Sequence, residues 1–334
     1  MRLASIRLSV PEPLRRLVRP LRADLGGAAD YVRDALRFRR HHSRDIEHAN
    51  CAQLSARLMF HAHSIEKGLA HEEIRYQFGA NALSALQRTL QHYDAAGCPI
   101  DSDARANALS VLRAYLDLHH ESGEDSSSVR RQFAQWLPEI AQADTELGGT
   151  VTITASSKRR NRDKGFAELF RGRTSVREYA DTPVDITLVS EALGIAAKAP
   201  SICNRQPYRV RLITDDAEIK RFLEVQGGVR GHSTPPVLLV ITTDIRDFVG
   251  YNERNQVYVN GGIYAMGLLL ALEYVGLAAC PLNTMFSRTQ EREVRRLVKA
   301  DHEAFIMAIS VGNFRDQVKS PRSFRYQLED RQLD

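Results

Sequence analysis

The pattern of apolar residues changes once along the chain, and this change constrains the fold more than any other feature. From about residue 31 to 147, apolar residues recur at helical spacing, as in Leu54 and Leu58. Beyond residue 164, helical segments alternate with β-type runs at 209–214, 237–242 and 305–310. We therefore expect an α+β protein, with an all-helical first half and a second half in which helices pack on a sheet.

A polar and basic segment separates the two halves. Gly148-Gly149 and the run 156–164 carry little apolar character, which is typical of a linker. The 334 residues are about right for two domains of roughly 100 to 200 residues each. We expect a helical domain with a basic leader at residues 1–150, and a second domain at residues 165–334.

Turn signals divide the helical half further. Breaks are expected at 96–99 and 121–123, with Asp101 and Ser126 as N-caps of the helices that follow.

One helix of the second half is expected to meet a partner. The segment 257–275 is apolar nearly all round and contains Gly261, Gly262 and Gly267. Small residues allow close backbone approach, and one chain of this size has little reason to bury such a helix on every side. A helix of this kind suits a close-packed interface.

Composition excludes several classes of protein. No stretch approaches the run of about 20 apolar residues that a membrane span needs. The cysteines show no CxxC or Cys/His spacing, so we expect neither structural zinc nor a disulfide framework, and a cytoplasmic setting is the simplest. The paired histidines are likewise not expected to bind metal, because no matching carboxylate or cysteine spacing accompanies them. The cysteines are Cys51, Cys98, Cys203 and Cys280, and the histidine pairs are at 41–42, 61/63 and 119–120.

The first 44 residues are rich in arginine, although the whole chain carries only +5. Such an excess can attract anionic lipid or nucleic acid. Pro11, Pro13 and Pro20 are expected to break any long amphipathic face, which favours a solvated leader followed by a surface helix. We expect no nucleic-acid partner, and a weak contact with a membrane surface through this leader is the alternative.

Two polar clusters in the second half carry the chemistry. The segment 173–179 reads Arg-Thr-Ser-Val-Arg-Glu-Tyr, and forked guanidinium donors with a hydroxyl can grip a phosphate. The segment 199–208 reads Ala-Pro-Ser-Ile-Cys-Asn-Arg-Gln-Pro-Tyr and offers donors and acceptors to a heterocycle edge. Taken singly, each cluster also fits an ordinary surface or capping loop.

In this order and at this separation, the two clusters resemble the nitroreductase family of FMN-dependent oxidoreductases. Later landmarks agree in order, namely the glycine-bearing helix, the segment 276–283, the strand ending at Phe314 and the run 319–322. The resemblance covers about residues 166–325. It implies a three-layer flavin domain, a homodimer with shared flavin sites, NAD(P)H as electron donor and a small organic acceptor.

The resemblance also implies roles for particular residues. Arg173, Thr174, Ser175 and Arg177 would line the FMN phosphate, ribityl chain and pyrimidine edge, and Lys319 and Arg322 would close on the phosphate. Pro200, Ser201 and Asn204 would come from the partner subunit, and Gln206 is a further cofactor-binding residue. Pro281, Leu282 and Asn283 match the turn whose backbone approaches flavin N5. No separate catalytic side chain is implied.

The sequence favours FMN over FAD. The proposed cations converge on one terminal phosphate, and no Gly-x-Gly-x-x-Gly turn follows a strand to hold a pyrophosphate. The chain departs from the family pattern at Thr174, where a second arginine is common, and at Tyr208, where Trp is often found. The loop at 226–231 matches only loosely, and the domain is short, so substrate-covering segments are expected to be reduced.

A third cluster lies in the helical half. His63, Glu66 and Lys67 share one helix face at i, i+3 and i+4, and could reach over the flavin. Their segment resembles one found ahead of the nitroreductase core in proteins of bacterial polysaccharide clusters. The alternative is a surface ion-pair patch at a helix end closed by Gly68.

Two functions remain open from the sequence. The first is an NAD(P)H-dependent flavin oxidoreductase that reduces a nitro compound, a quinone or a biosynthetic intermediate. The second is an assembly protein, with or without flavin, for example in polysaccharide biosynthesis. The colour of the purified protein would separate them.

Overall fold

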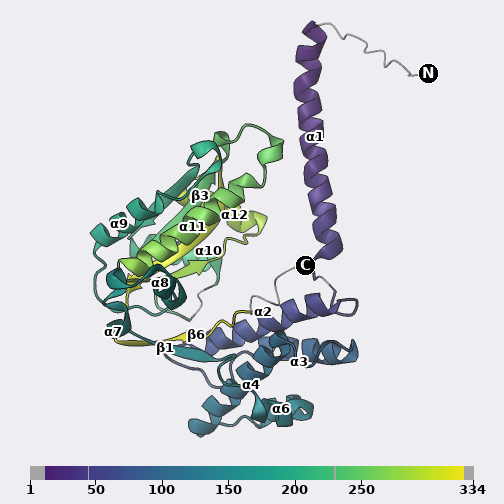
Figure 1. The fold of residues 1–334 in the computed structure, drawn as a ribbon, viewed down its shortest axis with the longest axis vertical. Coiled ribbons are helices and arrows are strands. Elements are labelled where there is room, and N and C mark those ends of the chain that lie inside the picture. The colour runs from purple at the N-terminus through teal and green to yellow at the C-terminus, as the bar shows by residue number, and fades with distance from the viewer. Residues whose placement is uncertain (1–11, 44, 229–230, 327–334) are drawn as a thin grey trace, which may run out of the picture.

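The computed structural model describes residues 12–43, 45–228 and 231–326, with side chains from residue 24 onward, and shows a helical part, a sheet-containing part and a long N-terminal helix (Figure 1). The helical part contains α2 (Cys51–Leu69), α3 (Ala80–Ala95), α4 (Asp103–Glu121), α5 (Ser127–Gln132), η1 (Ala134–Trp136) and α6 (Leu137–Gln142).

The helical part has a core of its own. Helix α2 packs on α3 and α4, and the buried side chains of Leu58, Leu86 and Leu112 fill the space between the three helices. The two expected breaks are confirmed, since α3 ends at Ala95 and α4 ends at Glu121. The predicted cap is one residue off, because Ser102 rather than Asp101 accepts a hydrogen bond from the first turn of α4.

The second part is a three-layer structure, as expected. Its antiparallel sheet has the order β2 (Tyr208–Ile213), β3 (Val237–Asp244), β5 (Glu303–Asn313) and β4 (Leu277–Leu282). Helices α9 (Ile186–Ala196) and α11 (Gln256–Tyr274) cover one face, while α10 (Asp216–Gln226) and α12 (Arg288–Val298) cover the other (Figure 1).

Strand β3 shows how the layers are held together. All eight of its residues are buried, and alternate side chains serve opposite faces of the sheet. Leu239 and Ile241 pack with α9 and α11, whereas Leu238 and Val240 pack with α10 and α12. A strand covered on both faces needs a continuous apolar run, which is why its sequence was recognisable.

The segment expected to be a linker is ordered. It forms β1 (Thr150–Thr154), α7 (Ala155–Lys158) and η2 (Asn161–Asp163), followed by α8 (Phe166–Gly172). Strand β1 pairs in antiparallel register with β6 (Gln317–Pro321) near the C-terminus. Its alternation of Thr with Val and Ile has the period of a strand but only two apolar residues. The expected boundaries of the two domains, residues 1–150 and 165–334, stay a prediction.

The expectation of a broken leader is wrong within the described residues. Helix α1 runs unbroken over Glu12–His41, through Pro13 and Pro20, and stands apart from the helical part (Figure 1). Pro13 lies in the first turn, where a proline removes no helical hydrogen bond. The helix contacts the second part through Asp34, whose carboxylate lies 2.8 Å from Arg254 Nε. Residues 1–11 of the leader lie outside the described residues, and its membrane contact stays a prediction.

Three shorter helices complete the second part, namely η3 (Ile202–Asn204), η4 (Ile245–Asp247) and η5 (Tyr251–Glu253). In the described part of the chain, no helix combines the length and apolar character that crossing a membrane requires.

One disulfide corrects the sequence analysis. Cys51, at the start of α2, is joined to Cys98, in the loop after α3, with the Cα atoms 5.5 Å apart. The two cysteines are 47 residues apart, and only the packing of α2 against α3 brings them together. The spacing rules used for cysteine pairs in sequence could not detect such a contact. The expected cytoplasmic setting stays a prediction.

Candidate functional site

The arginine-rich motif lies along the edge of the main sheet. Val176 N donates a hydrogen bond to Ala279 O at 3.0 Å, and Ser175 forms a parallel bridge with Ala279 of β4. On the other side, Ser320 Oγ of β6 donates to Ser175 O at 2.8 Å. The motif is thus held between β4 and β6, which fixes the backbone from which the side chains of Arg173 and Arg177 extend.

Three cations surround one buried thiol. The side chains of Lys67, Arg173 and Arg177 lie close enough to Cys280 to lower the pKa of its thiol, although burial raises that pKa more strongly. Burial also lowers the pKa of Lys67, and the nearby charge of Arg177 lowers it further. Among the described residues, none of the three cations forms an ion pair with a carboxylate. The arrangement therefore suits an anionic group.

The end of helix α2 contributes to this site. Lys67 lies in the last turn of α2, and α2 packs against β6. Glu66 is buried and lies 3.1 Å from Nδ1 of the part-exposed His63, and its second oxygen has no partner among the described residues. The helix ends at Leu69 rather than at Gly68.

Gly68 has a packing role instead of a capping role. A Cβ atom at this position would lie 2.0 Å from the ring of Phe78, in the loop that follows α2. Only glycine therefore lets the ring pack against the end of α2, and this contact helps to fix the turn that carries Lys67.

The segment expected near flavin N5 lies at the end of β4. Pro281 and Leu282 belong to the strand, and Asn283 follows it in an exposed position. Gln226 Nε2, at the end of α10, donates to Asn283 O at 3.1 Å. The loop that begins at Gln226 is thus placed beside this segment, although residues 229 and 230 lie outside the described residues.

The residues expected to contact the FMN phosphate beside Arg173 have other neighbours within one chain. Arg322 pairs with Glu146 of the helical part at 2.8 Å. Lys319 is exposed on β6, where it lines a different pocket. Thr174 donates from Oγ1 to Gly172 O at 3.2 Å. The roles of these three residues toward a phosphate stay predictions.

The second polar cluster lies far from the first within one chain. Ile202 N, in the loop that carries Pro200, Ser201 and Asn204, donates to Asn260 Oδ1 at 2.7 Å. Asn260 is in the first turns of α11, whereas the arginine motif is anchored near Glu273 at the other end of the same helix. Thirteen residues of helix correspond to about 20 Å. A single chain therefore does not bring the two clusters together.

The amide side chains of this loop make local contacts. Ser201 Oγ accepts a hydrogen bond from Gln206 N at 2.9 Å, and Gln206 Nε2 donates to Asn204 O at 3.3 Å. Cys203, Asn204 and Gln206 all have positive φ angles. The loop is thus a tight, internally bonded turn whose outer surface is exposed.

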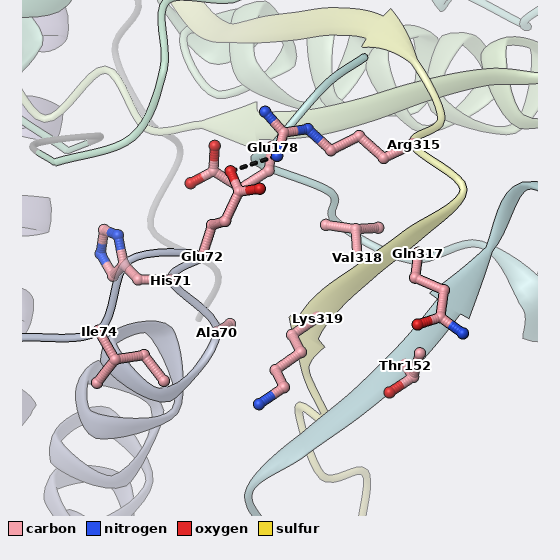
Figure 2. Close-up of a pocket in the computed structure, with 10 residues that line it drawn as sticks. All are labelled: Ala70, His71, Glu72, Ile74, Thr152, Glu178, Arg315, Gln317, Val318 and Lys319. Atoms are coloured by element: carbon pink, nitrogen blue, oxygen red, sulfur yellow. Dashed lines mark ion pairs between the residues drawn. The ribbon is translucent and has the colours of Figure 1, made fainter. Parts of the chain in front are cut away.

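The structure also assembles a cluster that sequence reasoning missed. His71 follows α2, Glu178 lies within the arginine-rich motif, and His232 follows α10, yet one potential ligand atom from each lies within 4.8 Å of the others. His71 and Glu178 line a pocket of about 260 Å³ together with Glu72, Arg315 and Lys319 (Figure 2). No sequence spacing could signal this cluster, because its members come from three distant segments.

Comparison with known proteins agrees with the motif assignment. Residues 170–229 match the model of the Nitroreductase family. An NADH dehydrogenase from Thermus thermophilus is 34% identical over 79 residues, which cover 24% of this chain and 38% of that protein. A 4-nitrobenzoate reductase from a Nocardioides species is 43% identical over 51 residues, which cover 15% of this chain and 21% of that protein. The chain thus matches less than half the length of either relative.

One solved structure, from Desulfovibrio desulfuricans, is of a protein assigned as a nitroreductase in complex with FMN. It is 21% identical, with a TM-score of 0.42, and the alignment covers 51% of this chain and 96% of that one. The family match over residues 170–229 starts in α8 and runs through the arginine motif, the second polar cluster and α10. The C-terminal half of this chain therefore contains a segment, residues 170–229, that matches the nitroreductase family.

Proposed function

We propose that this protein is an FMN-dependent oxidoreductase that takes hydride from NAD(P)H and delivers it to a small organic acceptor. The observation that carries the proposal is the convergence of Lys67, Arg173 and Arg177, none of which forms an ion pair with a carboxylate among the described residues. Glu273, whose charge acts on Arg173, is already paired with Lys158. Uncompensated cations that are partly buried are costly unless an anion binds there. FMN brings a phosphate of nearly two negative charges, so it fits the site.

The residues of this chain supply charge and orientation. When bound, FMN would supply the hydride chemistry itself. Arg173 and Arg177 extend from one fixed strand and can hold an anion through forked hydrogen bonds, while Lys67 adds a third charge from the helical part. Burial keeps the Cys280 thiol protonated, so this side chain adds no negative charge to the site.

The relatives support the choice of electron donor and acceptor. The match to an NADH dehydrogenase favours a nicotinamide donor, and the match to a 4-nitrobenzoate reductase is consistent with an aromatic nitro compound among the acceptors. Both matches cover only parts of those proteins, so the acceptor of this chain is left at the level of a small organic molecule.

We further propose that the protein works as a homodimer with shared flavin sites. Two α11 helices packed antiparallel about a twofold axis would bring the Ser201 loop of one chain near the Arg173 motif of the other. In this arrangement, the Ser201 loop and the arginine motif would meet across the dimer interface, although about 20 Å separates them within one chain.

The surface of α11 supports this pairing. A stripe of apolar or small residues at helical spacing is left uncovered along one side of α11. Val259 and Ile263 are 48% and 42% exposed, and a Cβ atom at Gly262 or Gly267 would meet no other atom within contact distance. Exposed apolar stripes of this kind are typical of interfaces between subunits. The stripe consists of Val259, Gly262, Ile263, Met266, Gly267 and Leu270.

The absorption spectrum of the purified protein tests the flavin assignment directly. We expect a yellow protein that releases FMN on denaturation and is bleached by NADH or NADPH. A colourless protein that stays colourless after FMN is added would favour the assembly-protein alternative, and release of FAD would also refute the proposal.

The arginines can be tested one at a time. Arg173→Ala and Arg177→Ala should each weaken FMN binding by about 1.5 to 3 kcal/mol, because each removes a charged hydrogen-bond donor. Arg171→Ala is the matched control, since Arg171 is exposed on the neighbouring helix α8. Equal flavin affinity in all three variants, measured by fluorescence titration, would mean that the motif does not bind FMN.

The dimer is tested with Gly262→Glu. A side chain at this position meets nothing within one chain, so the fold should survive while dimerisation and flavin binding are lost together. The neighbouring Gly261→Ala serves as the contrasting variant. Its Cβ atom would lie 2.4 Å from Ile306 within the same chain, so this variant should lower the stability of the folded monomer. Light scattering at micromolar concentration gives the mass. A wild-type monomer that holds one FMN per chain would contradict the shared-site proposal.

A further inference from the structure

The candidate lies outside the proposed flavin site, where the helical part meets the second part. His71 lies in the loop after α2, and His232 lies in the loop after α10. Glu178 directly follows Arg177 in the chain. We propose that His71, Glu178 and His232 together bind a divalent transition metal ion of the Zn²⁺ class. This site is independent of FMN.

The three side chains are already in contact. His232 Nδ1 lies 2.6 Å from Glu178 Oε1, and Ser233 Oγ donates to Glu178 Oε2 at 3.0 Å. The rings of His71 and His232 stack with their centroids 3.8 Å apart and an interplanar angle of 13°. The side chains of Glu178 and His232 are only 7% and 5% exposed. A buried carboxylate held by hydroxyl and imidazole groups is a positioned ligand rather than a solvated surface acid.

Metal binding requires a small rearrangement. The ligand atoms lie within 4.8 Å of one another, whereas ligands at about 2.0 to 2.2 Å from Zn²⁺ stand roughly 3.4 Å apart in a tetrahedron. Parallel imidazole rings cannot both direct a lone pair at one ion, so one ring must rotate about its Cβ–Cγ bond. Rotation of the His71 ring would replace its contact with the Gly231 backbone and its stacking on His232 by a bond to the metal.

The chemistry of the cluster selects the class of metal. Two imidazoles and one carboxylate are borderline ligands that prefer Zn²⁺ and its neighbours over Mg²⁺ or Ca²⁺. Ser233 would serve as the hydrogen-bonding partner that orients the carboxylate ligand.

The residues around the cluster give a metal ion access to it and limit its affinity. The pocket of about 260 Å³ lined by His71 and Glu178 provides a path for the ion and room for a water ligand (Figure 2). Arg177 and Arg315 bring positive charge to the same region, and Glu72 pairs with Arg315. The remaining positive charge should hold the affinity in the micromolar range rather than at the level of structural zinc fingers.

Such a metal would join two parts of the chain. His71 belongs to the segment that leaves α2, whereas Glu178 and His232 belong to the second part of the chain, Glu178 within the family match. Binding would therefore fix the end of α2 against the domain. The expected consequence is a higher unfolding temperature in Zn²⁺ than in chelator, because the ion binds the folded chain in preference to the unfolded one.

The test uses the full-length protein with any affinity tag removed and stripped with EDTA. Isothermal titration with Zn²⁺ should give one site per chain. Titration with Co²⁺ should give visible absorption bands typical of nitrogen and oxygen ligands. His71→Ala and His232→Ala should each weaken binding at least tenfold, and Glu178→Gln should do the same. The matched control is His120→Ala, because His120 is exposed on α4 away from the cluster.

Each outcome decides the proposal. Tenfold or greater losses in the cluster variants, with unchanged binding in the control, would support it. Absence of Zn²⁺ and Co²⁺ binding, or binding that survives all three cluster variants, would overturn it. Circular dichroism in EDTA identifies any variant that fails to fold, and since each ligand comes from a different segment, the remaining variants still give the answer.

Discussion

The buried ion pair between Lys158 and Glu273 offers a quantitative test of how the site is held in place. Lys158 Nζ lies 2.6 Å from Glu273 Oε1, and the two side chains are 5% and 3% exposed. Lys158 Nζ also donates to Gly172 O, which immediately precedes Arg173. Asn161 Nδ2 donates to Glu273 Oε1 at 3.1 Å. The pair thus ties α7 to the end of α11 and fixes the start of the arginine motif.

The expected energies differ between single and double substitutions. At 2.6 Å and an effective dielectric constant of about 20, the attraction is about 6 kcal/mol, and most of it is offset by desolvation of the two charges. Removing one partner leaves the other buried without compensation, so Lys158→Met and Glu273→Leu should each cost about 3 to 5 kcal/mol. Lys158→Met should fall at the lower end, because Asn161 still donates to Glu273.

The double variant Lys158→Met/Glu273→Leu should cost clearly less than the sum of the two, because no unpaired charge remains. Urea unfolding followed by circular dichroism gives the three free energies. FMN titration should show weaker binding in both single variants, since Gly172 loses its anchor. Additive effects within about 0.5 kcal/mol would refute the reasoning, because they would mean that the two charges do not interact.

Two further predictions concern the disulfide and acid stability. The Cys51–Cys98 bond closes a loop of 47 residues, so reduction, or Cys51→Ser, should lower the free energy of unfolding by up to about 4 kcal/mol. A thermal scan with and without reductant measures this, and an unchanged midpoint in the wild-type protein would show that the bond does not form. Hydrogen bonds from Arg246 lower the pKa of Asp244 from 3.8 to about 2, so its stabilising effect is complete above pH 4 and is lost as the pH falls through 2. Asp244→Asn should therefore cost about 2 kcal/mol at pH 7 and converge with the wild type near pH 2, and a constant difference at all pH values would contradict this cause.

The sequence predicted the elements whose pattern is continuous. Strands β3 and β5 appear as β-branched and apolar runs because they lie between helices, β2 appears from its apolar residues between two arginines, and α11 appears because it is apolar all round. Strand β1 was missed because it has one uncovered side and only Val151 and Ile153 as apolar residues. Short, partly polar strands depend on a partner that lies far along the chain, in this case β6.

Prediction of the candidate site from the sequence met the same limit. The arginine motif and the loop at 199–208 were found from local residue types, because each forms within one segment. Their separation along α11 could not be read from the sequence, since spacing along the chain says nothing about which end of a helix a loop contacts. The contacts of His71 with His232, and of Cys51 with Cys98, depend on packing between segments that carry no matching signal.

Residues at the end of α2 connect the helical part to the nitroreductase family domain. Lys67 contributes the third cation beside Arg173 and Arg177, and His71, four residues later, stacks on His232 of the domain. Strand β1 pairs with β6, and β6 in turn bonds to the arginine motif through Ser320. Under the proposed function, the end of α2 would form a wall of the flavin site. We therefore expect the helical part to take part in selecting the acceptor.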